Sequence, residues 1–128
     1  MPDTPRDAVT QEHPWLRHYG RVPAHLEYPE TTLYQALAAV ARRAPKAIAW
    51  DFFGTRSTYA AFLADIERCA AALASLGLRE GDRIIVSMPT SPQGIMAFYA
   101  VNRLGAVAAM VHPLSTAAEI TRYLDATG

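Results

Sequence analysis

The sequence is poor in residues that often carry chemistry. It contains one cysteine, Cys69, among 128 residues, so no intrachain disulfide can form and a reducing compartment is favoured. It contains one lysine, Lys46, and the other eleven basic residues are arginines. Twelve acidic residues balance these twelve basic ones. The overall charge therefore gives no reason to expect nucleic acid or an anionic membrane surface as a partner.

Long apolar runs are also missing. No stretch reaches the roughly 18 apolar residues that span a bilayer, so no transmembrane segment is predicted. The first fifteen residues lack the apolar core and basic flank of a signal peptide. We expect a cytoplasmic location, with peripheral contact with a membrane left open. The hydrophobic fraction of 51% predicts a globular chain.

Prolines and histidines are concentrated at the start of the chain. Residues 1–30 contain five of the nine prolines and three of the four histidines, which predicts an irregular N-terminal arm. The three histidines are His13, His18 and His25. Their spacing does not suit metal ligands on a helix, and no cysteine or carboxylate cluster accompanies them. We predict surface histidines and no metal site.

Residues 31–128 have the pattern of an α/β domain. Thr32 and Gln35 form a capping box ahead of a helix that Pro45 ends. The apolar positions that recur along this helix are Leu33, Ala36, Leu37, Val40, Ala41 and Ala44. Residues 46–59 predict a β-hairpin with its turn at Gly54-Thr55.

A second, longer helix follows the hairpin. Thr58 is expected to cap it and Gly77 to end it. Its predicted buried stripe is Phe62, Leu63, Ile66, Ala70, Leu73 and Leu76.

Residues 81–119 predict strand, helix, strand and a further helix start. The strands cover 83–88 and 106–111 and are almost wholly apolar, as in a buried βαβ unit of a parallel sheet. Ser91 and Pro92 start the helix between them, and Thr116 with Glu119 caps the last helix. The helix at 92–104 is apolar on every side, which predicts burial on every side. Because 128 residues offer too little protein to cover it, we expect an incomplete domain that self-associates through exposed apolar surface.

Four residues are candidates for a functional role, and each has a plainer explanation. Ser91 and His112 follow the carboxyl ends of the two strands, where open α/β sheets bind ligands, but helix and turn formation account for both. Asp51 is expected to face solvent or Arg56 on the hairpin. Cys69 borders the buried stripe and is expected to be an inert packed thiol. We therefore predict no catalytic, cofactor-binding or metal-binding residue.

Nucleotide and nucleophile motifs are absent. The sequence has no G-x-x-x-x-G-K-[ST] and no G-x-G-x-x-G, so neither common phosphate loop is present. The segment SMPTS at 87–91 lacks the glycines of a nucleophile elbow.

Several short segments together resemble the N-terminal region of the acyl-adenylate-forming enzymes, most closely a bacterial long-chain fatty acid–CoA ligase. They are Thr58-Tyr59, Leu76-Gly77-Leu78, Gly81-Asp82-Arg83, Met88-Pro89-Thr90-Ser91-Pro92, Leu104-Gly105-Ala106 and His112-Pro113-Leu114-Ser115. Each is weak alone, but their order and spacing are specific. The resemblance covers nearly the whole chain from about His13, including the arm HPWLRHYGRVPAHLEYP.

The resemblance implies an ATP-dependent acid–thiol ligase. Such an enzyme converts a fatty acid and ATP to acyl-adenylate and pyrophosphate, with Mg2+, and then transfers the acyl group to coenzyme A. The family's phosphate loop with its lysine, its adenine and ribose motifs and its C-terminal lysine have no counterpart in these 128 residues. We therefore expect a scaffold part of the N-terminal subdomain, inactive alone and binding no cofactor itself.

Other functions stay open at this stage. The parent enzyme is alternatively an aryl-CoA ligase or an amino acid-adenylating domain, because the acid-binding pocket lies outside the resemblance. Two non-catalytic alternatives are an α/β interaction module and a truncated homologue that serves as an assembly partner. A receiver-like module is disfavoured because Met88 and Val111 are followed by Pro89 and His112 rather than by acidic residues.

Overall fold

The computed structural model describes residues 13–127, and the chain separates into two units between Glu30 and Thr31. In the first unit, Pro14–His18 forms a short 3-10 helix that begins on a proline. The ring centroids of His13 and Trp15 lie 4.9 Å apart, and Arg17 Nε donates a hydrogen bond to His18 Nε2 at 3.0 Å.

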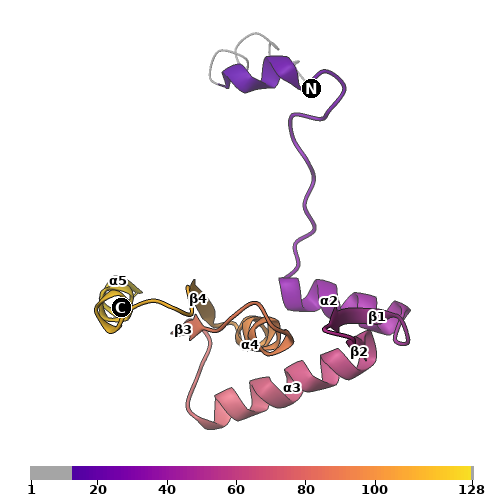
Figure 1. Ribbon diagram of the computed structural model, residues 1–128. Coiled ribbons are helices and arrows are strands. Elements are labelled where there is room, and N and C mark those ends of the chain that lie inside the picture. The colour runs from indigo at the N-terminus through magenta and orange to yellow at the C-terminus, as the bar shows by residue number, and fades with distance from the viewer. Residues whose placement is uncertain (1–12, 128) are drawn as a thin grey trace. The chain divides into compact units, whose positions relative to one another are not determined.

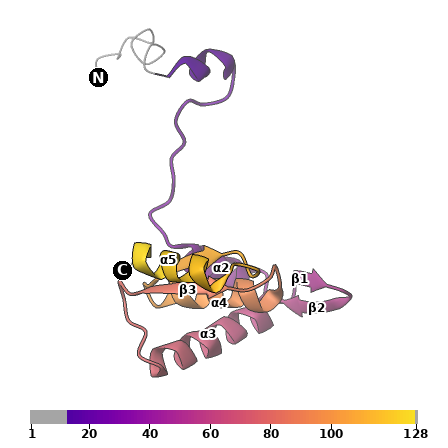
Figure 2. The same ribbon diagram turned by 60° about the vertical axis from the view of Figure 1, so that its left-hand side comes forward.

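Among its described residues, the second unit contains four helices and four strands (Figures 1 and 2). In chain order they are α2 (Leu33–Arg43), β1 (Ile48–Phe52), β2 (Thr55–Thr58), α3 (Tyr59–Ser75), β3 (Arg83–Ser87), α4 (Pro92–Arg103), β4 (Val107–Val111) and α5 (Ala117–Thr127). Within residues 13–127, none of the helices has the length and apolar character needed to cross a bilayer.

The start of α2 is the predicted capping box. The Thr32 hydroxyl accepts from the Gln35 amide at 3.1 Å, and the Gln35 side chain accepts from the Thr32 amide at 2.9 Å. The buried face agrees with the predicted apolar positions at Ala41, which is buried, but differs at Ala38, which is buried, and at Leu33, which is 56% exposed. The burial follows from packing against α3 and α4, which turns the alanine side of α2 inward.

The hairpin forms as predicted, but its turn lies one residue earlier. Phe52 pairs with Thr55, so the turn is Phe53-Gly54 and not Gly54-Thr55. Both turn residues have positive φ, 50° at Phe53 and 84° at Gly54, as a type I′ turn requires. Phenylalanine rarely adopts this conformation, which is why residue preference alone placed the turn incorrectly.

Helix α3 is capped by Thr58, whose hydroxyl accepts from the Ala61 amide at 3.3 Å, and Gly77 follows its end with φ of 105°. Phe62 and Ile66 are buried as predicted. Leu76 does not belong to the buried stripe and is 84% exposed. It is the C-cap residue, beyond the last turn of α3, and therefore leaves the face that packs on α4.

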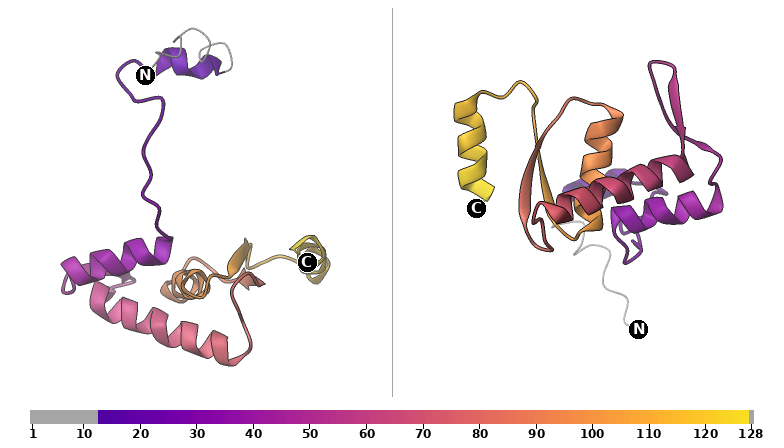
Figure 3. Two further views of the ribbon diagram at one scale, coloured as in Figure 1. Left: turned by 180° about the vertical axis from the view of Figure 1, so that it is seen from behind. Right: turned by 90° about the horizontal axis from the view of Figure 1, so that it is seen from below.

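The βαβ unit is confirmed. Strands β3 and β4 pair in parallel with Arg83 opposite Val107 and Ser87 opposite Val111. The two-stranded sheet lies between α4 and α5 (Figures 1 and 3).

The predicted burial of these two strands is wrong for most of their residues. Val86 is buried, but Val107 and Met110 are 54% and 52% exposed. Pairing between strands leaves the side chains on both faces of the sheet uncovered. Helix α5 contacts β3 more extensively than β4, so the side chains of β4 stay more exposed. The apolar helix α4 is likewise covered on one side, because Ala100 and Val101 are buried while Ile95 is 43% exposed.

The core lies where α2, α3 and α4 meet. Its buried members are Phe62, Ile66, Ala70 and Ala100. The rings of Phe62 and Tyr99 meet edge to face at 6.3 Å, a favourable aromatic geometry. Trp50 packs on this core from the hairpin, and its indole nitrogen is buried with no hydrogen-bond acceptor among the described residues.

Candidate functional site

The carboxyl edge of the parallel sheet is where an open α/β fold usually binds ligands. β3 and β4 both end there, and the segments 88–91 and 112–116 lead to α4 and α5. A pocket of about 190 Å³ lies at this edge. It is lined by Met88, Pro89, Thr90, Ser91, Gly94, Ile95, Phe98 and Met110. These residues are mostly apolar, so the pocket offers few polar groups to orient a ligand.

Ser91 is used by the helix that it starts. Its hydroxyl accepts a hydrogen bond from the Gly94 amide at 3.3 Å, the N-cap interaction predicted from the sequence. A β-carbon on Gly94 would lie 2.9 Å from the Pro89 carbonyl oxygen. The segment before α4 therefore folds tightly over the helix start.

His112 is exposed and takes part in a local turn. Its Nδ1 accepts from the Leu114 amide at 3.2 Å, and its carbonyl accepts from the Ser115 amide at 3.0 Å. It does not line the 190 Å³ pocket. The structure thus places Ser91 and His112 at the same sheet edge, where each is hydrogen-bonded within its own turn.

The turn after His112 ends at the predicted capping box of α5. The Thr116 amide donates to Glu119 Oε2 at 2.7 Å, and the Glu119 amide donates to Thr116 Oγ1 at 3.3 Å. The hydrogen bond from the Thr116 backbone is the main reason that the pKa of Glu119 lies below its ordinary value. This carboxylate serves to cap a helix.

Asp51 and Cys69 have the structural roles expected of them. Asp51 Oδ2 accepts from Arg56 Nε at 2.6 Å, and Oδ1 accepts from the Gly54 amide at 3.1 Å, so both oxygens stabilise the hairpin. Cys69 is half-buried, and burial raises the pKa of its thiol. A raised thiol pKa reduces the thiolate fraction at neutral pH and disfavours a nucleophilic role.

A polar cluster that was not predicted joins α2, α3 and α4. The Tyr34 hydroxyl donates to Glu67 Oε1, and Arg103 Nε donates to the same oxygen at 3.2 Å. The Arg103 guanidinium carbon lies 5.3 Å from the centre of the Tyr34 ring, within cation–π range. The members lie 33 and 36 residues apart along the chain, so no local pattern indicates the cluster.

Each ionisable group of this cluster is shifted by its neighbours. The hydrogen bond from Tyr34 lowers the pKa of Glu67, and the interaction with Glu67 raises the pKa of Arg103. Desolvation, followed by the hydrogen bond to Glu67, raises the pKa of Tyr34. All three shifts favour a phenol, carboxylate and guanidinium at neutral pH. Because the three groups pair with one another, the cluster is suited to holding helices together.

Replacing Glu67 with glutamine is expected to weaken the dependence of the free energy of unfolding on pH below neutrality. The pKa of Glu67 is lower in the folded protein than in the unfolded chain. The ionised carboxylate therefore stabilises the fold fully above its pKa in the unfolded chain, and this stabilisation is lost as the pH falls through its pKa in the folded protein. At pH 7 we expect the variant to lose about 0.5–1 kcal/mol, since the pair is partly exposed. Urea unfolding from pH 7 to pH 3 measures this effect. Asp65→Asn on the same helix is the control, and parallel curves for wild type and Glu67→Gln would contradict the prediction.

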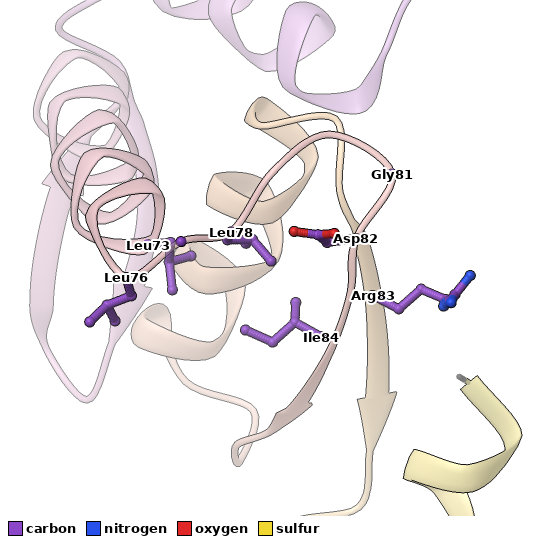
Figure 4. Close-up of a pocket in the computed structure, with 8 residues that line it drawn as sticks. Leu73, Leu76, Leu78, Gly81, Asp82, Arg83 and Ile84 are labelled. Atoms are coloured by element: carbon purple, nitrogen blue, oxygen red, sulfur yellow. The ribbon is translucent and has the colours of Figure 1, made fainter.

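A second recess lies at the opposite, amino edge of the sheet. It has a volume of about 390 Å³ and lies between the end of α3 and the start of β3. Figure 4 shows Leu73, Leu78 and Ile84 facing one another across it, while Arg83 points away. Asp82 stabilises the turn before β3, because its Oδ2 accepts a hydrogen bond from the Arg79 amide at 2.7 Å. The recess is a gap between scaffold elements and is lined by apolar and polar residues alike. Within residues 13–127, no group of three or more His, Cys, Asp or Glu residues is placed to hold a metal ion.

Comparison with known proteins places these features in a family. Residues 37–128 match the model of the AMP-binding enzymes. The long-chain-fatty-acid–CoA ligase of Bacillus subtilis is 34% identical over 117 residues, which cover 91% of this chain and 21% of that enzyme. The 4-coumarate:CoA ligase 1 of Petunia hybrida is 36% identical over 70 residues, which cover 55% of this chain and 13% of that enzyme.

A solved structure shares the fold. The N-terminal domain of FACL13 from Mycobacterium tuberculosis matches with a TM-score of 0.71 and 32% identity, covering 75% of this chain and 25% of that domain. The α/β arrangement described above is therefore part of an adenylate-forming ligase N-terminal domain. This chain spans about a fifth of the length of the Bacillus relative. Because the family model covers most of the sequence, this chain belongs to the AMP-binding enzyme family.

Proposed function

We propose that this chain is scaffold in a ligase that activates a fatty acid with ATP and transfers the resulting acyl group to coenzyme A. The observation that carries the proposal is the 34% identity to the Bacillus subtilis long-chain-fatty-acid–CoA ligase across 91% of this chain. A cytoplasmic enzyme with peripheral contact with a membrane suits an amphipathic substrate of this class.

The residues of this chain do not fit ATP, Mg2+ or coenzyme A by themselves. Segment 88–91 contains no glycine and no lysine, and the Ser91 hydroxyl already caps α4. Lys46 lies before the hairpin and does not line the pocket at the carboxyl sheet edge. In our proposal these groups bind elsewhere in the whole ligase, and this chain supplies the packed layer that supports their site.

The purified 128-residue chain is expected to release no pyrophosphate from ATP when a fatty acid is added. The reason is the lack of a phosphate-binding loop and of a metal-binding cluster in the described residues. A coupled pyrophosphate assay with palmitate tests this, with the Bacillus ligase as the positive control. Acid-dependent release by this chain would refute the scaffold role.

The parent activity needs a separate experiment on the whole reading frame. Sequencing downstream of Gly128 should reveal a Thr/Gly-rich loop with a lysine if the ligase proposal holds. The encoded protein should then form acyl-CoA with palmitate. An aryl acid is the second candidate substrate, favoured by the match to 4-coumarate:CoA ligase. Product formation with 4-coumarate or an amino acid, and none with palmitate, would replace the fatty acid proposal.

We also propose that the isolated chain self-associates. Val107 and Met110 on β4, Ile95 on α4 and Leu124 on α5 are each more than 40% exposed, and the parallel sheet has two unpaired edges. Light scattering across a concentration series should show an average mass that rises above 14.0 kDa. A monodisperse monomer that binds no hydrophobic dye at high concentration would contradict this proposal.

A further inference from the structure

The tip of the β1–β2 hairpin combines two unfavourable features in one residue. Phe53 is 95% exposed, the highest value among the large hydrophobic side chains that the structure describes. It also has a φ of 50°, a conformation that bulky residues rarely adopt and that asparagine or glycine normally fills in such a turn. Neither feature stabilises the hairpin. Strain and exposure at one position indicate a role outside the fold.

The neighbouring residue enlarges the apolar tip. The Phe52 ring lies 4.6 Å from the Phe53 ring in an edge-on arrangement, and Phe52 is 37% exposed. The hairpin extends away from the helices of its unit (Figures 2 and 3), so its turn at Phe53-Gly54 is a projecting tip. A projecting apolar tip can insert into a deformable surface such as a lipid bilayer, which has no preformed pocket.

The hairpin and the segment before it carry an excess of positive charge, although the net charge of the whole chain is zero. Residues 42–56 contain four basic side chains and one acidic one, a net charge of +3. Arg56 pairs with Asp51, which leaves Arg42, Arg43 and Lys46 in excess. All three are exposed and lie in the last turn of α2 or just after it.

Backbone hydrogen bonds fix these cations to the base of the hairpin. The Ala47 amide donates to the Ala44 carbonyl at 3.1 Å, and the Ala60 amide donates to the Pro45 carbonyl at 3.0 Å. These bonds join the segment between α2 and β1 to the end of α2 and to the start of α3. The apolar tip and the basic base therefore form one element.

We propose that this hairpin is a membrane-contacting wedge in which Phe53 enters an anionic lipid bilayer and the basic base contacts its headgroups. A five-residue strand spans roughly 16 Å, and amphipathic elements embed roughly 5–10 Å into the headgroup and acyl boundary. If Phe53 is embedded by roughly 5–10 Å, the base of the hairpin lies about 6–11 Å outside the bilayer surface. Lysine and arginine side chains can reach the headgroups from there. This inference rests on the membrane part of the proposed function and identifies the element that makes the contact.

One aromatic pair and three cations give weak, reversible binding. Basic residues contribute individually small attractions to an anionic surface, and these decline with distance and salt. Binding is therefore expected to require both anionic lipid and Phe53. A protein pocket is the competing partner, and it would give no dependence on lipid charge.

The test is co-sedimentation of the 128-residue chain with sucrose-loaded vesicles at low salt. Wild type should bind vesicles of equal phosphatidylglycerol and phosphatidylcholine, and bind pure phosphatidylcholine at least several-fold less. Phe53→Asn should reduce partitioning about tenfold while keeping or raising the urea midpoint, because Asn-Gly favours a type I′ turn. Phe53→Trp should retain binding, since tryptophan suits the membrane interface.

Leu76→Asn is the matched control, because Leu76 is 84% exposed but lies on a different element. It should change partitioning less than twofold. Absence of binding by wild type, equal binding by Phe53→Asn, or an equal loss in Leu76→Asn would overturn the proposal. The assay contains no acid, ATP or coenzyme A. A negative result therefore removes the wedge and leaves the ligase proposal standing.

Discussion

Replacing Ile66 with alanine is expected to lower the free energy of unfolding by about 3 kcal/mol, because the side chain is lost from a packed site. Ile66 is fully buried, with 0% exposure, at the centre of α3. It belongs to the cluster with Phe62, Ala70 and Ala100, where α3 meets α2 and α4. Neighbouring side chains on three helices cannot all move to fill the cavity. The variant therefore loses the free energy of burying the removed methyl and methylene groups and also bears the cost of the cavity that remains.

Urea unfolding followed by circular dichroism measures this loss. Ile66→Val should cost about 1 kcal/mol, which gives a graded series at one position. Leu76→Ala, at an 84% exposed position next to the same helix, should change stability by less than about 0.5 kcal/mol. Equal effects of Ile66→Ala and Leu76→Ala would show that α3 does not pack as described.

Replacing Gly94 with valine is expected to cost about 2 kcal/mol, because the added atoms overpack the start of α4. A β-carbon there would lie 2.9 Å from the Pro89 carbonyl oxygen and 3.5 Å from the Met88 β-carbon. The closer contact is with backbone, so the segment before α4 has to move. Alanine would add the same β-carbon clash but gain some helix propensity, so its cost should be smaller.

Thermal unfolding of Gly94→Val, Gly94→Ala and Gln93→Ala tests this order. Gln93 is the exposed neighbour on the same helical turn, and its replacement should be nearly neutral. A Gly94→Val variant as stable as wild type would mean that segment 88–91 is free to move away from α4.

Features set by neighbouring residues were predictable from the sequence. The caps at Thr32, Thr58 and Ser91 depend on a side chain and an amide three residues later, so their spacing is visible in the sequence. The parallel pairing of β3 with β4 follows from two apolar strands around a helix. The family was likewise indicated by ordered short segments, and the match over residues 37–128 confirms it.

Features that depend on distant residues were not predictable. The cluster of Tyr34, Glu67 and Arg103 forms only when three helices pack, and nothing in its local sequence marks it. The turn at Phe53-Gly54 contradicts residue preference, so preference gave the wrong position. The absence of a catalytic residue stays a prediction, because the structure shows how Ser91 and His112 are bonded but does not test their chemistry.

The contact between α2 and α4 includes a hydrogen bond that bears on the order in which the two helices dock during synthesis. The backbone amide of Tyr34, in the first turn of α2, donates to Asn102 Oδ1 at 2.8 Å across 68 residues of sequence. At ordinary translation speeds, those residues take roughly 3 to 14 s to synthesise. During that interval the Tyr34 amide is satisfied by water, and α2 has only its own capping box to start it. The start of α2 is therefore completed by a side chain that is synthesised seconds later, which delays full docking of α2 until α4 has emerged.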